Sequence, residues 1–178
     1  MLVDVLGPVA ADSGLGETLD RARRHLAEQI EDDGLVRYHG RPDHLEPGLG
    51  AKITPDADDT ALAWRIAGGD QRKLPEVLRT LDSYRDSNGL YRTWLASREQ
   101  YVSIDPGKDP NTGDIVIQMH VIMFLAKTDP DAARMAWDGC GTVIESFSFL
   151  SALLLHQGLF GTAVLTTEIA FPIFRPHS

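Results

Sequence analysis

Apolar residues recur at three- and four-residue spacing from Glu17 to Glu31, with charged residues between them. The apolar positions are Leu19, Ala22, Leu26 and Ile30. This spacing places apolar side chains on one face of a helix. The pattern therefore predicts an amphipathic helix over residues 17–31, which ends where Asp32, Asp33 and Gly34 follow.

The same patterning predicts three further helices. Residues 40–55 are rich in glycine and proline and indicate a loop, after which a helix is expected from Ala57 to Ala67. A third helix is expected over about 73–84, and a fourth over 112–127. Apolar residues cover nearly the whole circumference of the fourth helix, so we expect it to be buried on all sides. No alternating strand of convincing length occurs, and the fold class expected is all-α.

The two halves of this region resemble each other when one is shifted by 55 residues. The shift aligns Arg24 with Arg79, Leu26 with Leu81, Gly34 with Gly89, Leu35 with Leu90, Arg37 with Arg92, Pro55 with Pro110 and Asp59 with Asp114. Each unit then has an outer helix, an acidic turn ending in Gly-Leu-x-Arg, a long loop and a more apolar inner helix. This pattern predicts helical hairpins stacked side by side.

The repeat suggests a division of the chain. We expect an N-terminal segment over 1–16 and one helical-repeat domain over 17–178. Within the domain the repeat units are about 17–71 and 72–127, and an apolar C-terminal segment covers 128–178. A length of 178 residues agrees with a single domain.

Charge and cysteine content exclude some kinds of partner. The formal net charge is -9, so the chain would repel a phosphate backbone, and we expect no nucleic-acid partner. Cys140 is the only cysteine, which excludes an internal disulfide and a zinc site made of several thiolates. His39 and His44 lack a second pair of ligands, so no zinc site is expected there.

The two ends of the chain differ in character. Residues 1–16 lack a basic n-region and do not resemble a signal peptide, so a cytoplasmic location is expected. Ser146–Thr167 has no charged residue and is long enough to span a membrane, which takes about 20 apolar residues. His156 and Gln157 interrupt it, however, and no basic cluster flanks it. It therefore indicates a buried hairpin or a homo-oligomer interface, with peripheral membrane contact as the second interpretation.

Three carboxylates, Asp56, Asp58 and Asp59, stand together at the start of the helix expected after Pro55. Helix capping explains one or two of them, but three exceed what capping needs. Crowded carboxylates cannot all ionise, and burial raises their pKa by up to about 3–5 units. The helix dipole opposes this by only about 0.3–2 kcal/mol, and one pKa unit corresponds to about 1.4 kcal/mol. Such a cluster keeps a proton only in a dry cavity, and elsewhere it is merely a cap.

The segment Pro55-Asp56-Ala57-Asp58-Asp59-Thr60-Ala61 resembles the acid motif of class II terpene cyclases, the group that includes squalene–hopene cyclases. These are α/α-toroid proteins with prenyltransferase and squalene-oxidase repeats. The turn from Asp86 to Trp94 is similar to the turns between their helices, and the resemblance covers about 17–127. It implies Asp58 as proton donor with Asp56 and Asp59 hydrogen-bonded around it, a hydrophobic isoprenoid substrate, and no cofactor or metal.

The same resemblance bears on the architecture. A closed toroid of this family has about six hairpins and needs nearly twice this length. The expected fold is therefore helical hairpins resembling part of an α/α toroid, an incomplete barrel. A partner subunit would close it, sequence absent here would complete it, or it would stay open as a groove.

Cation-forming chemistry also needs a suitable cavity wall. The aromatic faces of Trp64, Tyr91, Trp94 and Tyr101 are candidates for stabilising a carbocation, with core or loop packing as the alternative. In the second unit the acid motif is reduced to Asp114, the residue expected to face the same cavity. Gln118 and His120 follow on that helix as candidate ligand-facing groups, and a satisfied core histidine is the alternative for His120.

Other functions match parts of the same motif. Asp56-x-Asp58-x-Thr60 also fits the nucleophile motif of haloacid-dehalogenase-type phosphatases, but a proline-containing loop precedes it where that chemistry needs a buried strand. A magnesium site for a diphosphate would prefer carboxylates one helical turn apart, which Asp58 and Asp59 do not provide. A non-catalytic helical-repeat module for binding or structure stays open, favoured by the short chain and the aromatic content of only 7%.

Overall fold

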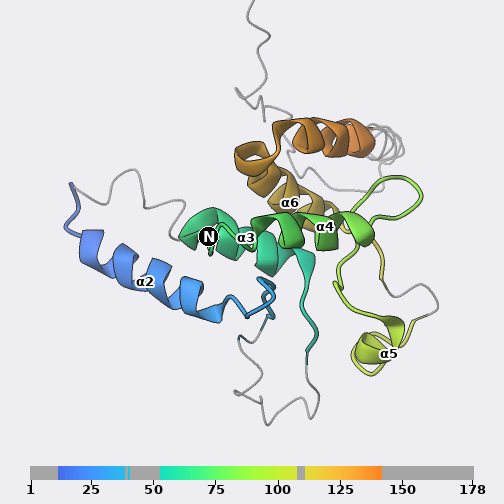
Figure 1. Ribbon diagram of the computed structural model, residues 1–178, viewed down its shortest axis with the longest axis horizontal. Helices are drawn as coiled ribbons and strands as arrows, with labels where there is room; N and C mark the ends of the chain where they lie inside the picture. The colour runs from blue at the N-terminus through green and yellow to red at the C-terminus, as the bar shows by residue number, and fades with distance from the viewer. Residues whose placement is uncertain (1–11, 39, 41–52, 108–110, 142–178) are drawn as a thin grey trace, which may run out of the picture. The chain divides into compact units, whose positions relative to one another are not determined.

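The computed structural model describes residues 12–38, 40, 53–107 and 111–141 (Figure 1). This part of the chain contains α2 (Gly16–Gln29), α3 (Ala57–Ala67), α4 (Leu74–Ser83), α5 (Arg98–Tyr101) and α6 (Ile115–Thr128). Residues 130–141 are also helical. Within the same residues the β structure consists of isolated bridges, so the all-α class is confirmed. The helices expected at 17–31, 57–67, 73–84 and 112–127 are present with ends shifted by at most three residues.

The starts of α3 and α6 follow from their capping residues. Asp56 has extended backbone and its side chain accepts a hydrogen bond from the Asp59 N–H, which begins α3. Asp114 begins α6 in the same way, because its side chain accepts from the Val116 N–H at 2.7 Å. Each cap satisfies a backbone donor that the first turn of a helix otherwise leaves without a partner.

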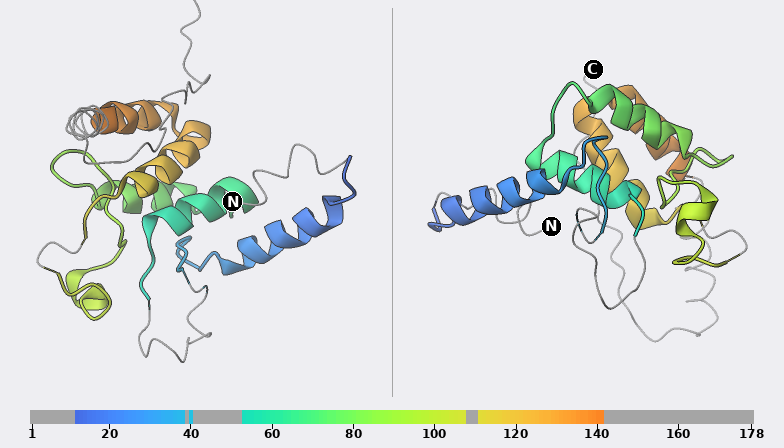
Figure 2. Two further views of the ribbon diagram at one scale, coloured as in Figure 1. Left: turned by 180° about the vertical axis from the view of Figure 1, so that it is seen from behind. Right: turned by 60° about the horizontal axis from the view of Figure 1, so that its bottom comes forward.

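Helix α3 is the centre of the packing and contacts both α2 and α6. Both views of Figure 2 show it between these two helices. The rings of Trp64 on α3 and Phe124 on α6 lie 6.3 Å apart at an angle of 51°. The Trp64 indole N–H donates to the Gly34 carbonyl at 2.7 Å. Trp64 therefore joins α3 and α6 to the turn that follows α2.

The expectation that the fourth helix is buried on all sides is wrong for its first turn. Ile115 and Val116 are 38% and 57% exposed, whereas Val121 and Phe124 are almost fully buried. The difference arises because α6 packs against α3 at Phe124, beside Trp64, while its first turn follows the exposed cap Asp114.

The turns after α2 and α4 have matching hydrogen bonds at the shift of 55 residues. Gly34 and Gly89 have φ angles of +86° and +82°, which glycine adopts without strain. The Gly34 N–H donates to Glu31 O at 2.9 Å, and the Gly89 N–H donates to Asp86 O at 3.0 Å. The Leu35 and Leu90 carbonyls accept from Glu31 and Asp86 in the same way. The turns are thus alike, while the repeat and the domain limits drawn from it stay predictions.

The chain leading into α3 is held on both sides by backbone hydrogen bonds. Its Asp56 N–H donates to Val36 O at 3.1 Å, and the Ala57 N–H donates to Thr93 O at 2.8 Å. A further bond comes from the segment that contains Thr93, where the Leu95 N–H donates to Pro55 O at 2.9 Å. These bonds fix the start of α3, where the three carboxylates lie.

Some expectations concern residues outside the described part of the chain. These are the segment 1–11, His39 and His44, and Ser146–Thr167 with its proposed interface or membrane contact. Among the described residues, no helix is both long enough and apolar enough to cross a membrane.

Candidate functional site

The three carboxylates of the acid motif converge at the N-terminus of α3. One carboxylate oxygen each from Asp56, Asp58 and Asp59 lies within 4.8 Å of the other two. Asp56 is only 3% exposed, whereas Asp58 and Asp59 are half-buried. The Asp56 side chain accepts a hydrogen bond from the Asp59 N–H at 2.9 Å. Asp56 therefore caps α3 and is also the most buried member of the cluster.

The surroundings of Asp56 favour its protonated form. Burial, above all, raises the pKa of Asp56 to about 9, and the charge of Asp59 and a hydrogen bond with the Asp58 carboxyl act in the same direction. The Asp59 N–H works against them but is outweighed. At neutral pH, Asp56 therefore keeps its proton, and the protonated side chain donates to Asp58. This agrees with the expectation that the pKa of at least one of the crowded carboxyls is raised. The role of Asp58 as the donor to a substrate stays a prediction.

The cluster also has the composition of a hard-cation site. Each carboxylate offers one oxygen, the ligand that Mg²⁺ and Ca²⁺ prefer. The helical spacing of Asp58 and Asp59 did not indicate such a group, because the third oxygen comes from Asp56 in the extended residue before the helix. A cation would have to displace the proton that burial keeps on Asp56.

A pocket of about 320 Å³ adjoins the cluster, between α2, the chain that follows it, and α3. Its lining consists of His25, Leu26, Gln29, Val36, Arg37, Tyr38, Gly40, Asp59, Leu62 and Ala63. The acid motif contributes Asp59 to this wall, while Asp56 lies beneath it as a buried residue. The two sides of the pocket come from helices separated by a long loop, so no local pattern in the sequence predicts it.

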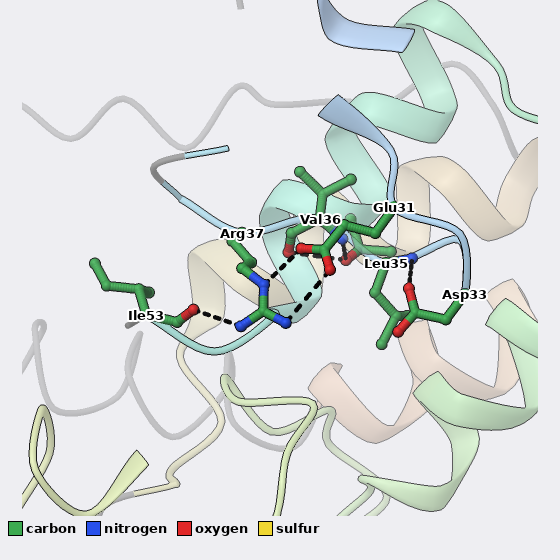
Figure 3. Close-up of polar contacts among 7 residues, drawn as sticks. Glu31, Asp33, Leu35, Val36, Arg37 and Ile53 are labelled. Carbon is green, nitrogen blue, oxygen red and sulfur yellow. Dashed lines mark hydrogen bonds and ion pairs between the residues drawn. The ribbon is translucent and has the colours of Figure 1, made fainter. Parts of the chain in front are cut away.

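Arg37 holds the pocket wall in place (Figure 3). Its Nε lies 2.5 Å from the Glu31 carboxylate, and its Nη1 donates to the Ile53 carbonyl at 2.8 Å. The guanidinium therefore connects the end of α2 to the chain entering α3. The only signal for it in the sequence was the Gly-Leu-x-Arg turn, which we interpreted as a repeat feature and not as part of a site.

The four candidate aromatic residues lie in other surroundings than the pocket. Trp64 belongs to the core beside Phe124. Tyr91 is 3% exposed and has the Arg85 guanidinium 4.9 Å from its ring centre. Trp94 and Tyr101 stack with 6.3 Å between their ring centres. Packing accounts for each of these contacts.

Trp94 is the candidate aromatic residue whose backbone reaches the acid cluster. It forms an antiparallel bridge with Asp56, although its indole N–H donates to the Asp105 carboxylate at 3.2 Å. The structure thus brings the Trp94 backbone, and not its ring, into a described contact with the acid motif.

The polar candidates on α6 also have identified surroundings. Gln118 is 1% exposed. Its side-chain amide makes two hydrogen bonds to the backbone of Tyr91, accepting from the N–H at 2.8 Å and donating to the carbonyl at 2.7 Å. Asp114 is exposed and caps α6. His120 is half-buried, and its buried Nδ1 has no hydrogen-bond partner among the described residues, so the alternative of a satisfied core histidine fails at this atom.

Comparison of this chain with protein-family models, with curated proteins and with solved structures finds no match.

Proposed function

We propose that this protein is a terpene-cyclase-like acid catalyst that protonates a linear isoprenoid or a related lipid and starts its cyclisation. The observation that carries the proposal is the buried carboxyl of Asp56, whose pKa of about 9 leaves it protonated at neutral pH. Protonation of an alkene or epoxide needs such a carboxyl, because an ionised carboxylate has no proton to give.

In the proposed reaction, Asp58 is the acid, and Asp56 and Asp59 lie beside it in the cluster. The Asp58 carboxyl gives its proton to one carbon of the terminal alkene, the π electrons form the new C–H bond, and the other carbon becomes a cation. The cation is then attacked by the next double bond of the chain, and the resulting cyclic cation loses a proton to water to give a neutral cyclic alkene, while the Asp58 carboxylate is left behind. Protonated Asp56, hydrogen-bonded to Asp58, can pass its proton to Asp58, and Asp56 then takes up a proton from water.

We further propose that the helices form hairpin repeats resembling part of an α/α toroid. The matching hydrogen bonds of the Gly34 and Gly89 turns support this interpretation. A homo-oligomer, a cytoplasmic location and peripheral membrane contact belong to the same proposal and depend on residues outside those described.

A second candidate is a non-catalytic helical-repeat module for binding or structure. The observation in its favour is that Trp64, Gln118 and Trp94 are engaged in packing or hydrogen bonds within the fold. Asp56, on this interpretation, serves as the cap of α3.

The two candidates differ in whether a product is formed. The purified protein would be incubated with linear isoprenoid alkenes and epoxides of several lengths, and cyclic products would be sought by gas chromatography with mass spectrometry. We expect a cyclic product from the wild type and its loss in Asp58→Asn. Asp70→Asn is the matched control, because Asp70 pairs with Arg72 in an exposed turn away from the cluster.

The outcomes separate the alternatives. A cyclic product that survives Asp58→Asn would remove Asp58 as the acid. No product from a wild-type protein that is folded by circular dichroism would favour the non-catalytic module.

A further inference from the structure

The backbone of Asp56 pairs with two segments that come from distant parts of the chain. Its N–H donates to Val36 O at 3.1 Å. It also forms an antiparallel bridge with Trp94, where the Ala57 N–H donates to Thr93 O at 2.8 Å. The position of Asp56, and with it the burial of its carboxyl, therefore depends on what holds Val36 and Trp94.

A buried hydroxyl holds Val36. Thr60 on α3 is 0% exposed, and its Oγ1 accepts from the Val36 N–H at 3.0 Å. The same hydroxyl donates to Val36 O at 3.4 Å. One side chain thus binds both backbone groups of Val36, the residue whose carbonyl also accepts from Asp56.

A buried amide holds Trp94 in the same manner. Asn111 is 4% exposed, and its Oδ1 accepts from the Trp94 N–H at 2.7 Å. Its Nδ2 donates to the Trp94 carbonyl at 3.0 Å. Each of the two residues that pair with Asp56 is therefore bound at its N–H and its carbonyl by one buried polar side chain.

From this arrangement we infer that Thr60 and Asn111 are positioning residues of the acid cluster, which hold the two segments paired with Asp56 and so keep its carboxyl away from water. The inference rests on the proposed function for the chemical use of that carboxyl. It adds two residues that act on the cluster through the backbone of Val36 and Trp94.

Loss of either side chain would bring water to the cluster. A buried backbone N–H without an acceptor is costly, so the Val36 or Trp94 N–H that loses its partner would take one from solvent. Water at these residues would also solvate the neighbouring carboxyl of Asp56, and solvation favours the ionised form of an acid.

The test is the titration of Asp56 in the full chain, followed by carbon-13 NMR of the aspartate carboxyls and assigned by comparison with Asp56→Asn. The pKa of Asp56 is about 9 in the wild type. Thr60→Val removes the hydroxyl and should lower this pKa by at least about one unit, and Asn111→Leu should lower it in the same direction. Thr60→Ser restores a hydroxyl that accepts and donates, and should leave the pKa within about 0.3 unit of the wild type.

Thr128→Val is the matched control for the loss of a threonine hydroxyl. The Thr128 hydroxyl donates to Phe124 O within α6, so its removal should leave the pKa of Asp56 unchanged. The charges of Asp59 and Asp58 also raise this pKa, and they are the same in the control as in the test variants.

Two results would overturn the inference. One is a pKa of Asp56 that keeps its wild-type value in folded Thr60→Val and Asn111→Leu, which would reduce both residues to general supports of the fold. The other is an equal fall in Thr60→Val and Thr60→Ser, because the hydroxyl would then not be the cause. If circular dichroism finds Thr60→Val unfolded, Thr60→Cys takes its place and should lower the pKa by at least about half a unit, since a thiol is a weaker donor and acceptor than a hydroxyl.

The titration needs no substrate, so this inference and the proposed function fail separately. The expected falls in pKa without any cyclic product from the wild type would leave Thr60 and Asn111 as positioning residues and would count against the proposed catalysis alone.

Discussion

Asp56 combines two properties that act against each other. As the N-cap of α3 it lies at the positive end of the helix dipole, which favours the carboxylate by about 0.3–2 kcal/mol. Burial and the neighbouring carboxylates favour the neutral acid and raise its pKa to about 9. Burial prevails because the dipole term is small beside the cost of removing a charge from water.

This conflict makes the stability of the protein depend on pH. The pKa of Asp56 rises from 3.8 to about 9 on folding, so between these values the native protein binds one proton more than the unfolded chain. The contribution of Asp56 is therefore complete below about pH 4 and is lost as the pH rises towards 9, by up to about 1.4 kcal/mol per pH unit. Asp56→Asn should abolish this slope and be more stable than the wild type at about pH 8, because the amide oxygen still caps α3 without titrating.

Urea unfolding at a series of pH values measures the effect. Asp114→Asn is the matched control, since Asp114 caps α6 through the same kind of hydrogen bond but is exposed. Its stability curve should run parallel to that of the wild type. A slope in Asp56→Asn equal to the wild-type slope would contradict the assignment of the buried proton to Asp56.

At this scale the sequence predicted which carboxylates meet, but not which of them holds the proton. Their spacing is local, and local spacing is visible in a sequence. The burial of Asp56 depends instead on the backbone bonds that hold the start of α3, from Asp56 to Val36 and from Ala57 to Thr93, whose partners lie 20 and 36 positions apart along the chain. For the same reason the aromatic candidates could be named, but their partners, such as Tyr101 for Trp94, could not.

At the scale of elements, periodicity was sufficient for the long helices. The helix at 57–67 was predicted with its observed limits, because a proline and an aspartate precede it and two glycines follow it. The short α5 was not predicted, since four residues carry no helical period. Its signal was the capping box, in which Ser97 and Gln100 bond each other's backbone.

Gly34 and Gly89 have similar backbone conformations but different surroundings, so the same substitution can be compared at both positions. Gly34 and Gly89 both have positive φ, so alanine at either position costs about 1–2 kcal/mol of backbone strain. A Cβ on Gly34 would also lie 2.5 Å from Val77 Cγ2, whereas a Cβ on Gly89 would meet only the end of the Arg85 side chain at 3.9 Å. We therefore expect Gly34→Ala to be more destabilising than Gly89→Ala by about 1–3 kcal/mol, the usual cost of overpacking, as measured by urea unfolding. Equal losses would show that α4 does not pack tightly against the turn after α2.

At the scale of the molecule, α3 has two different sides. One side joins α6 through Trp64 and Phe124, and the other lines the pocket with α2 through Asp59, Leu62 and Ala63. The proposed repeat agrees with the order of the helices. A repeat treats its two units as equivalent, however, so it could not predict a pocket that lies between the two helices of the first unit. The acid cluster is thus carried on a helix whose opposite side is anchored in the core, which gives the carboxylates a fixed position.

The anchoring of α3 by α6 leads to a prediction about cooperativity. Phe124 is 1% exposed, and its truncation to alanine should cost about 3–5 kcal/mol through lost burial and the cavity left behind. Because the Phe124 ring packs beside Trp64, hydrogen exchange should become faster in α3 as well as in α6. Met135→Ala, at a residue that is 60% exposed, should change neither. If Phe124→Ala accelerated exchange in α6 alone, α3 and α6 would open separately, and the acid cluster would owe its position to α2 and the turn at Gly34.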